Sequence, residues 1–271
     1  MKDRFLNVLI YFLTTGLGVF AYVYPLLGTP GSGSTTARQN DLPLMMAVLL
    51  ALCLLVLIYE IQEWRLNNKL IALLGVLIAM NAILRFFEMA LPVFGGFSPV
   101  FFLIILTGYV FGGRMGFLMG ALTMLVSALI TGGVGPWLPN QMFTAGWVGM
   151  SAFLVRRIVL WSKIKNPKFE LILLALFGLI WGFGYGAITN LWFWPFIAGP
   201  QNQSFSSALN LTTTLKNYGV YYLATSSFWD LGRAVGNVVM VTVFGMAALK
   251  TLRRFQTRFN FSHHAVDQEG L

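Results

Sequence analysis

The stretch that decides the fold is residues 95–149, GGFSPVFFLIILTGYVFGGRMGFLMGALTMLVSALITGGVGPWLPNQMFTAGWVG. Two apolar segments in it are joined by the short turn Gly112–Arg114. A charge-free loop rich in Gly, Pro and Trp follows, and a third apolar segment begins after it. So much continuous apolar sequence is typical of membrane helices and not of a soluble enzyme. Non-helical backbone within a membrane is tolerated where it lines a cavity, so this loop is a candidate wall of a pocket.

The composition of the whole chain supports a membrane protein. Of the 271 residues, 57% are hydrophobic and only 10% are charged, whereas soluble domains carry roughly 25% charged residues. The net charge is +9. The basic residues lie mainly in short loops between apolar runs, which indicates membrane orientation and not nucleic-acid binding. We therefore expect an all-α integral membrane protein.

The apolar segments are predicted to be transmembrane helices, because lipid offers no partner for backbone polar groups. The eight segments are Phe5–Leu27, Leu44–Tyr59, Lys69–Leu91, Pro99–Gly112, Met115–Thr131, Asn140–Leu160, Phe169–Trp192 and Tyr218–Leu249. A polar linker rich in Gly and Ser, residues 28–41, sets the first two apart. The predicted organisation is a two-helix membrane extension at residues 1–65, a six-helix bundle at residues 66–258 and a cytoplasmic tail at residues 259–271.

The positions of Lys and Arg predict the topology. Nearly all of them, from Lys2 to Arg258, fall in loops on one side of the predicted helices, and the opposite side carries only Arg38 and Lys216. Loops rich in Lys and Arg stay in the cytoplasm. Both termini are therefore predicted to be cytoplasmic, in a multi-pass protein of the plasma membrane.

Polar and aromatic side chains are expected to meet at the external end of the bundle. Counting about 1.5 Å per helical residue places Arg85, Glu88 and Asp230 near that end, and ionisable groups inside a membrane are functional candidates by default. The predicted substrate-binding residues are Asn81, Arg85, Glu88, Trp137, Asn140, Gln141, Asn190, Trp192, Trp229, Asp230 and Arg233. Two alternatives stay open: the indoles form an aromatic belt, and the pairs Arg85/Glu88 and Asp230/Arg233 merely neutralise each other.

Sequence signatures of catalysis are missing. The chain has no G-x-x-x-x-G-K-[ST] phosphate loop, no H-E-x-x-H motif and no Cys/His cluster, and its two histidines, His263 and His264, lie in the tail. We therefore expect a non-enzyme without a catalytic or metal site. The alternatives are a lipid- or prenyl-modifying enzyme that uses Glu88 or Asp230 as acid or base, and a non-catalytic membrane scaffold.

Small residues recur at a spacing of four in several predicted helices. Gly178, Gly182 and Gly186 form one series, and Gly232 and Gly236 form another. Such positions let helix backbones approach closely. They predict packing inside the bundle, with a surface for a partner helix as the alternative.

Residues 98–153 resemble the substrate-specific (S) components of energy-coupling factor (ECF) transporters. The most specific part is a G-P-W-x-P-x-Q-M signature, present as Gly135, Pro136, Trp137, Pro139, Gln141 and Met142. The resemblance extends from Lys69 to Arg254 and implies a six-helix subunit that captures a vitamin externally. Such a subunit docks on a membrane coupling protein with two ATPases and releases its ligand inside the cell, so ATP is used by the partners and this chain needs no cofactor.

The resemblance also suggests a partner surface and a substrate. Ala72, Gly75 and Ala79 loosely match the small residues with which the first core helix of this family contacts the coupling protein. The Trp-rich loop is most similar to that of members associated with cobalamin or related corrinoids, while pyrimidine or thiamin-related precursors stay open. The two additional N-terminal helices depart from the family pattern and leave open how the first core helix reaches its partner.

Overall fold

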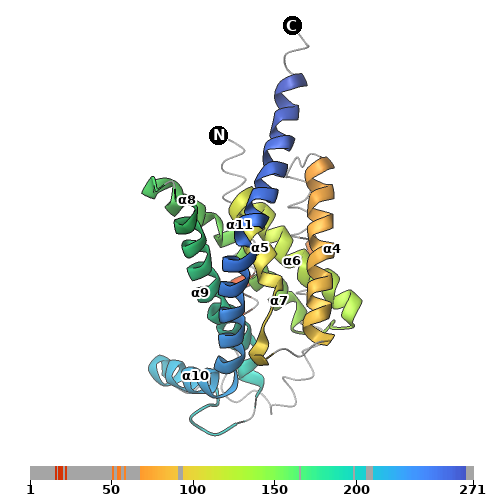
Figure 1. Ribbon diagram of the computed structural model, residues 1–271. Coiled ribbons are helices and arrows are strands. Elements are labelled where there is room, and N and C mark those ends of the chain that lie inside the picture. The colour runs from red at the N-terminus through yellow and green to blue at the C-terminus, as the bar shows by residue number, and fades with distance from the viewer. Residues whose placement is uncertain are drawn as a thin grey trace.

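The computed structural model describes residues 68–90, 94–164, 166–197, 199–205 and 210–266, together with residues 16, 18–20, 22, 51, 54, 55 and 58. All regular elements in this part of the chain are helices (Figure 1). The stretches long and apolar enough to cross a membrane are Lys69–Glu88, Gly113–Thr131, Leu138–Ser162, Pro167–Phe196 and Ser227–Arg258, and a shorter apolar helix spans Val100–Phe111. The predicted all-α membrane bundle is confirmed.

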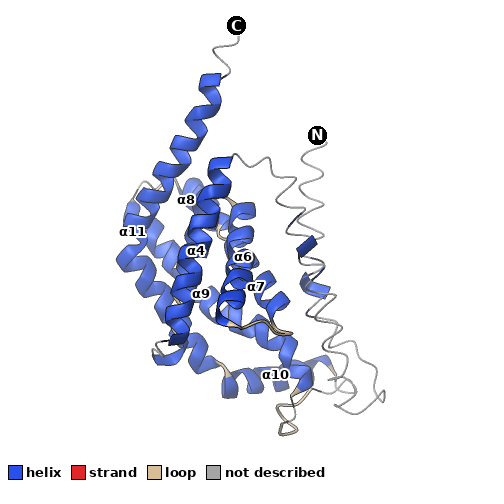
Figure 2. Cartoon of the chain, turned by 90° about the vertical axis from the view of Figure 1, so that its right-hand side faces the viewer, coloured by secondary structure: helices blue, strands red, loops and turns tan. Residues whose placement is uncertain are grey.

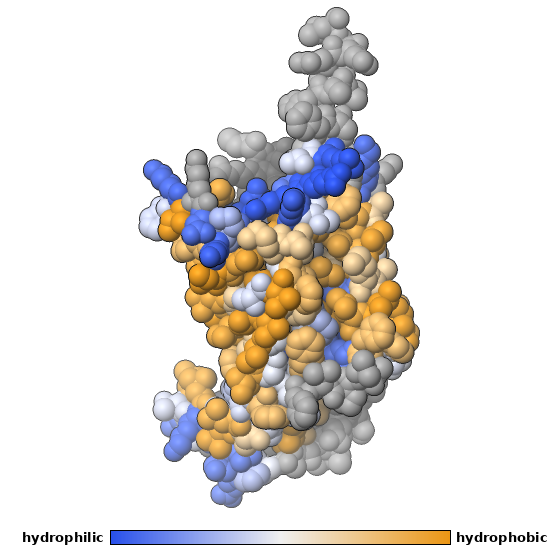
Figure 3. Space-filling model, viewed as in Figure 1, coloured by the Kyte–Doolittle hydropathy of each residue, from blue (hydrophilic) through white to orange (hydrophobic). Residues whose placement is uncertain are grey.

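The described elements of the bundle follow one another along the chain. They are α4 (Asn68–Ala90), the 3-10 turn η2 (Phe94–Gly96), α5 (Val100–Phe111), α6 (Gly113–Thr131), α7 (Leu138–Ser151), α8 (Phe153–Ser162), α9 (Pro167–Phe193), the 3-10 turn η3 (Trp194–Phe196), α10 (Leu211–Thr225) and α11 (Ser227–Val266). The most extensive helix contacts join α6 to α7 and α9 to α11. On the face shown in Figure 3, hydrophobic surface lies between two more hydrophilic ends.

Helix α5 forms the centre of the bundle. Every residue from Val100 to Val110 is buried, as expected of a helix that is apolar on all sides. Its 12 residues extend over only about 18 Å, so it is shorter than the hydrocarbon core of a bilayer. The neighbouring helices enclose it, and none of its faces has to meet lipid.

A single residue separates α5 from α6. Gly112 has a φ of 99°, a conformation that only glycine adopts easily, and its N–H caps α5 by donating to the carbonyl oxygen of Gly108 at 3.0 Å. The two apolar segments are thus joined within the predicted turn Gly112–Arg114, although Gly113 and Arg114 already belong to α6.

The spacing-four glycines of α9 lie in the contact with α11. A Cβ on Gly182 would lie 2.3 Å from Cα of Ala234, and one on Gly186 would lie 1.8 Å from Oδ2 of Asp230. Real Cβ atoms do not approach other atoms this closely. The two glycines therefore serve packing inside the bundle, which is the first of the two roles predicted for them.

The last predicted helix is two helices. Residues 218–249 were expected to form one span, but α10 ends at Thr225, Ser226 leaves the helical conformation with a φ of −126°, and α11 begins at Ser227. The Ser227 hydroxyl donates to the carbonyl oxygen of Leu223 at 2.8 Å. Ser and Thr hydroxyls compete in this way for backbone groups and favour breaks. As a result α10 lies across one end of the bundle (Figures 1 and 2).

The predicted N-terminal extension lies largely outside the described residues. Its described positions are all helical. The Tyr22 hydroxyl donates to the carbonyl oxygen of Asn140 at 2.7 Å and also bonds the hydroxyl of Thr144, so this part of the chain packs on α7. At the other terminus, α11 continues as helix to Val266, past the predicted boundary at residue 258, because no Pro or Gly interrupts residues 259–266.

Candidate functional site

A cleft of about 250 Å³ opens at the end of the bundle that carries α10. One wall comes from the loop before α7 and the first turn of α7, and the other from the last turns of α9. The lining residues are Trp137, Asn140, Gln141, Thr189, Asn190, Trp192 and Phe193. Two indoles and a phenyl ring thus border several amide and hydroxyl groups, the mixture typical of sites for small organic ligands.

The loop before α7 is shaped around the Trp137 ring. Nε1 of Trp137 donates to the carbonyl oxygen of Gly133 at 3.2 Å. The ring lies against Gly135, where a Cβ would come within 2.4 Å of ring atom Cζ2. Gly135 is therefore needed at this position because a side chain there would collide with the indole ring. The ring borders the cleft and stays 45% exposed.

Two cleft side chains are buried without hydrogen-bond partners. Asn140 is 1% exposed, and neither its Nδ2 nor its Oδ1 is bonded by any described residue. Nε1 of Trp192, a residue 3% exposed, is unpartnered in the same way. A buried polar group without a partner destabilises a protein by about 1–3 kcal/mol. The amide and the indole N–H together offer two kinds of donor and one acceptor to a molecule in the cleft.

A charged network lies beside the cleft, between α9, α10 and α11. Nη1 of Arg233 forms an ion pair with Oδ1 of Asp230 and donates to the carbonyl oxygen of Gly182 at 3.3 Å. The Tyr222 hydroxyl donates to Oδ2 of Asp230 at 2.7 Å. Burial and the neighbouring Asp230 carboxylate raise the pKa of Tyr222, so the phenol stays protonated and able to donate. The Asp230 carboxylate is thereby held from two helices.

Tyr185 joins this network to the charges of α4. Its ring lies 5.0 Å from the guanidinium carbon of Arg233, a cation–π distance. Arg85, Glu88, Asp230 and Arg233 are the charged groups near Tyr185. Glu88 accepts a hydrogen bond from the Ser98 hydroxyl at 2.8 Å. The two predicted i,i+3 pairs are therefore parts of one cluster around a buried tyrosine.

The cleft and the charged network are connected at the break between α10 and α11. Nδ2 of Asn190 donates to the hydroxyl of Ser226 at 2.7 Å. The carbonyl oxygen of Ser226 accepts the backbone N–H of Asp230 at 3.0 Å. One residue thus contacts a cleft side chain on one side and the helical turn that carries Asp230 on the other.

Comparison with known proteins assigns the family. A model of the ECF transporter substrate-specific component matches residues 69–245. The chain belongs to this family. Comparisons with curated proteins and with solved structures give no match. The S component is thus a subunit of a transporter and not an enzyme, which removes the lipid- or prenyl-modifying alternative.

The family assignment also identifies the kind of assembly. S components bind a small molecule and work with the membrane and ATPase components of the ECF transporter. The multi-pass membrane location predicted from the apolar segments agrees with the family and with the helices of the structure.

Not every predicted site residue of this S component lies in the cleft or the charged network. Asn81 is buried, and its Nδ2 donates to the carbonyl oxygen of Val100 at 3.0 Å and to the hydroxyl of Thr123 at 3.3 Å, so it joins α4 to α5 and α6. Trp229 is 56% exposed and packs edge-on against Phe228. Neither residue is among those that line the cleft.

Several residues of the two groups were not among the predicted site residues. Thr189 and Phe193 line the cleft, and Tyr185 and Tyr222 take part in the charged network. Thr189 and Phe193 are direct neighbours of the predicted Asn190 and Trp192, which is the one signal that the sequence offered for them.

The predicted partner residues lie on the outer face of α4. Ala72, Gly75 and Ala79 are exposed, and a Cβ on Gly75 would have no atom within 4 Å. In the N-terminal extension, Gly18 and Tyr22 lie against α7. Within the described part of the chain, this face of the first core helix is open.

Proposed function

We propose that this S component captures a compact heteroaromatic vitamin or vitamin precursor in the cleft between α7 and α9. The carrying observation is that Asn140 and Trp192 present buried, unpartnered polar atoms in a cleft walled by aromatic rings. A ligand that stacks on an indole and forms hydrogen bonds with both the Asn140 amide and the Nε1–H of Trp192 would remove both deficits at once.

The size of the cleft bears on the choice of vitamin. Its volume of about 250 Å³ is slightly below the range of roughly 300–1,000 Å³ typical of ligand sites. It suits a ligand of one or two rings, such as the pyrimidine or thiamin-related precursors left open by the sequence. A corrinoid, which the Trp-rich loop suggested, is far larger and would require the two walls to separate.

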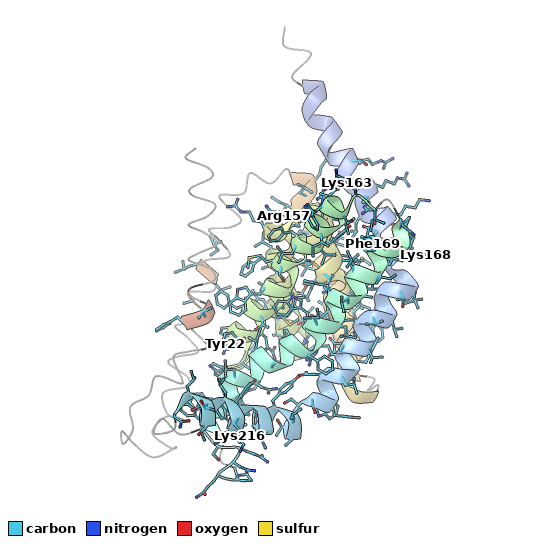
Figure 4. The ribbon with its side chains drawn as sticks, turned by 90° about the vertical axis from the view of Figure 1, so that its left-hand side faces the viewer. Tyr22, Arg157, Lys163, Lys168, Phe169 and Lys216 are labelled. Atoms are coloured by element: carbon cyan, nitrogen blue, oxygen red, sulfur yellow. The ribbon has the colours of Figure 1, made fainter. Side chains whose placement is uncertain are left out.

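The proposal includes an orientation and a partner surface. The basic side chains Arg157, Lys163 and Lys168 gather at the end of the bundle opposite Lys216 (Figure 4). By the preference of basic loops for the cytoplasm, the cleft faces outward and both termini face inward. The open face of α4 with Ala72 and Gly75 is then available to the coupling component, because small residues allow close helix contact.

Ligand titration of the purified protein tests this proposal. A panel of vitamins, including thiamin, its pyrimidine precursor and cobalamin, is titrated while tryptophan fluorescence and thermal stability are followed. Asn140→Leu should reduce affinity for the ligand found by about 10-fold or more, since one lost hydrogen bond in a buried site corresponds to about 1–3 kcal/mol. Asn166→Leu, far from the cleft at the start of α9, is the matched control. Folded protein that binds no member of the panel would refute the proposal.

A further inference from the structure

A second cavity lies at the opposite, basic end of the bundle. It measures about 620 Å³ and lies between α8, the start of α9 and α11. A smaller cavity of about 170 Å³ adjoins it and shares Val159, Leu160 and Arg253 with it. Neither cavity belongs to the cleft at the α10 end.

The polar part of this double cavity is cationic. Lys163, Arg253 and Arg156 line it, against the single carboxylate of Glu170. Nη2 of Arg253 is paired with Glu170, and Tyr109 lies under the guanidinium at 5.9 Å. Arg253 is thus fixed in place, while its remaining N–H groups are able to bind an anion.

The remaining basic side chains are also held toward the cavities. Nη1 of Arg156 donates to the carbonyl oxygen of Val110 at 2.9 Å, which orients its guanidinium beside the smaller cavity. Lys163 adopts a left-handed conformation with a φ of 57° at the end of α8, unusual for a residue other than glycine. It has no ion-pair partner among the described residues.

The other walls are apolar and open toward the membrane. Leu160 is 67% exposed and Met246 is 45% exposed, and both line the larger cavity. Trp161, next to Leu160 in α8, is 86% exposed. A soluble anion needs no such apolar wall, whereas a lipid places its acyl chains against one.

We propose that this double cavity binds the headgroup of an anionic phospholipid, with the acyl chains along Leu160 and Met246. Basic pockets between transmembrane helices at the cytoplasmic boundary recognise such headgroups. The site would fix the height of α8 and α11 relative to the membrane surface. It is independent of the substrate cleft, so failure of either proposal leaves the other standing.

Binding of short-chain lipids to the purified protein in neutral detergent tests the proposal. The probes are dioctanoyl phosphatidylglycerol, dioctanoyl phosphatidylcholine and glycerol 3-phosphate. We expect the anionic lipid to bind at least 10-fold more tightly than the zwitterionic lipid. Glycerol 3-phosphate should bind more weakly than the anionic lipid, because it lacks the acyl chains. Equal affinity of the two lipids, or of glycerol 3-phosphate and the anionic lipid, would overturn the proposal.

Matched charge variants separate a built site from general attraction. The double variant Arg156→Gln/Lys163→Gln removes two cavity charges, and Arg157→Gln/Lys168→Gln removes two charges from the same end outside both cavities. At about 1 kcal/mol per basic side chain, the first should weaken binding of the anionic lipid about 25-fold and the second much less. Equal losses would show an unspecific basic surface and refute the site.

A variant without a change of charge tests the apolar wall. Met246→Trp places a bulky indole ring in the larger cavity, where it should obstruct the acyl chains. It should lower affinity for the anionic lipid at least 5-fold, and unchanged thermal stability is the control for folding. If no lipid preference exists and the first double variant instead weakens assembly with the coupling component, the surface is a protein contact and the lipid proposal is wrong.

Discussion

The contact between α9 and α11 predicts opposite effects for two glycines that are two residues apart. A Cβ on Gly182 would meet Cα of Ala234 at 2.3 Å, whereas one on Gly184 would meet its nearest neighbour, in the Trp181 ring, at 3.6 Å. Gly→Ala inside a helix is otherwise favourable by about 1 kcal/mol. We therefore expect Gly184→Ala to preserve or raise stability and Gly182→Ala to lower it.

The size of the difference follows from the overlap. Forcing one extra carbon atom into a packed interface destabilises a protein by about 1–3 kcal/mol, and here the obstacle is backbone, which cannot rotate away. At about 2–4 °C per kcal/mol, Gly182→Ala should melt about 2–12 °C below the unchanged protein, while Gly184→Ala should melt at the same temperature as that protein or above it. Ala234→Gly should restore little of this loss, because the nearest atom is Cα and not Cβ.

Thermal unfolding in one detergent, followed by intrinsic fluorescence, measures both variants side by side. The carbonyl oxygen of Gly182 also accepts from Arg233, so Gly182→Ala should weaken substrate binding as well. Equal melting temperatures for Gly182→Ala and Gly184→Ala would show that α9 and α11 are not in backbone contact, and the reasoning on this interface would fail.

Three further predictions concern the site. Asp230→Ala and Arg85→Ala should each reduce substrate uptake by whole cells more than Arg157→Ala, which removes a charge at the far end of the bundle; equal effects would mean that the charges serve only topology or stability. Tyr22→Phe removes hydrogen bonds to Asn140 and Thr144 of α7. It should therefore lower stability by about 1–2 kcal/mol, measured as a melting shift of several degrees, and an unchanged melting temperature would contradict the contact. Because the pKa of Tyr222 is raised in the folded protein, its contribution to stability is complete below pH about 10 and is lost as the pH rises further; Tyr222→Phe should flatten this alkaline decline in a melting series, and an unaltered decline would show that other groups cause it.

Sequence reasoning succeeded where one physical constraint dominates. Lipid offers no hydrogen-bond partner to the backbone, so the apolar runs alone indicated where the membrane-crossing helices lie. The constraint weakens at the membrane boundary, where water is again available. There the helix that hydropathy alone would continue is broken at Ser226, next to the Ser227 hydroxyl that binds the carbonyl oxygen of Leu223, and α10 turns across the end of the bundle.

The same distinction explains the site. Counting residues along a helix predicts how deep a residue lies in the membrane, and that depth alone put Asn81 and Trp229 among the predicted substrate-binding residues. The direction of a side chain depends on the rotation of its helix, which packing decides. Asn81 faces α5 and α6, and Trp229 faces outward. Thr189 and Phe193 were missed for the same reason, because the amino-acid sequence does not show which side of α9 faces the cleft.

The contact between α9 and α11 and the charged network around Asp230 depend on each other. Gly186 has no Cβ, and the Asp230 carboxylate occupies the space that this Cβ would fill, 1.8 Å from Oδ2. Tyr222 and Arg233 then hold the carboxylate from two sides. A larger residue at position 186 would therefore displace the charge as well as the helix. Since Ser226 contacts Asn190 of the cleft and the turn that carries Asp230, a ligand that moves Asn190 acts directly on the start of α11.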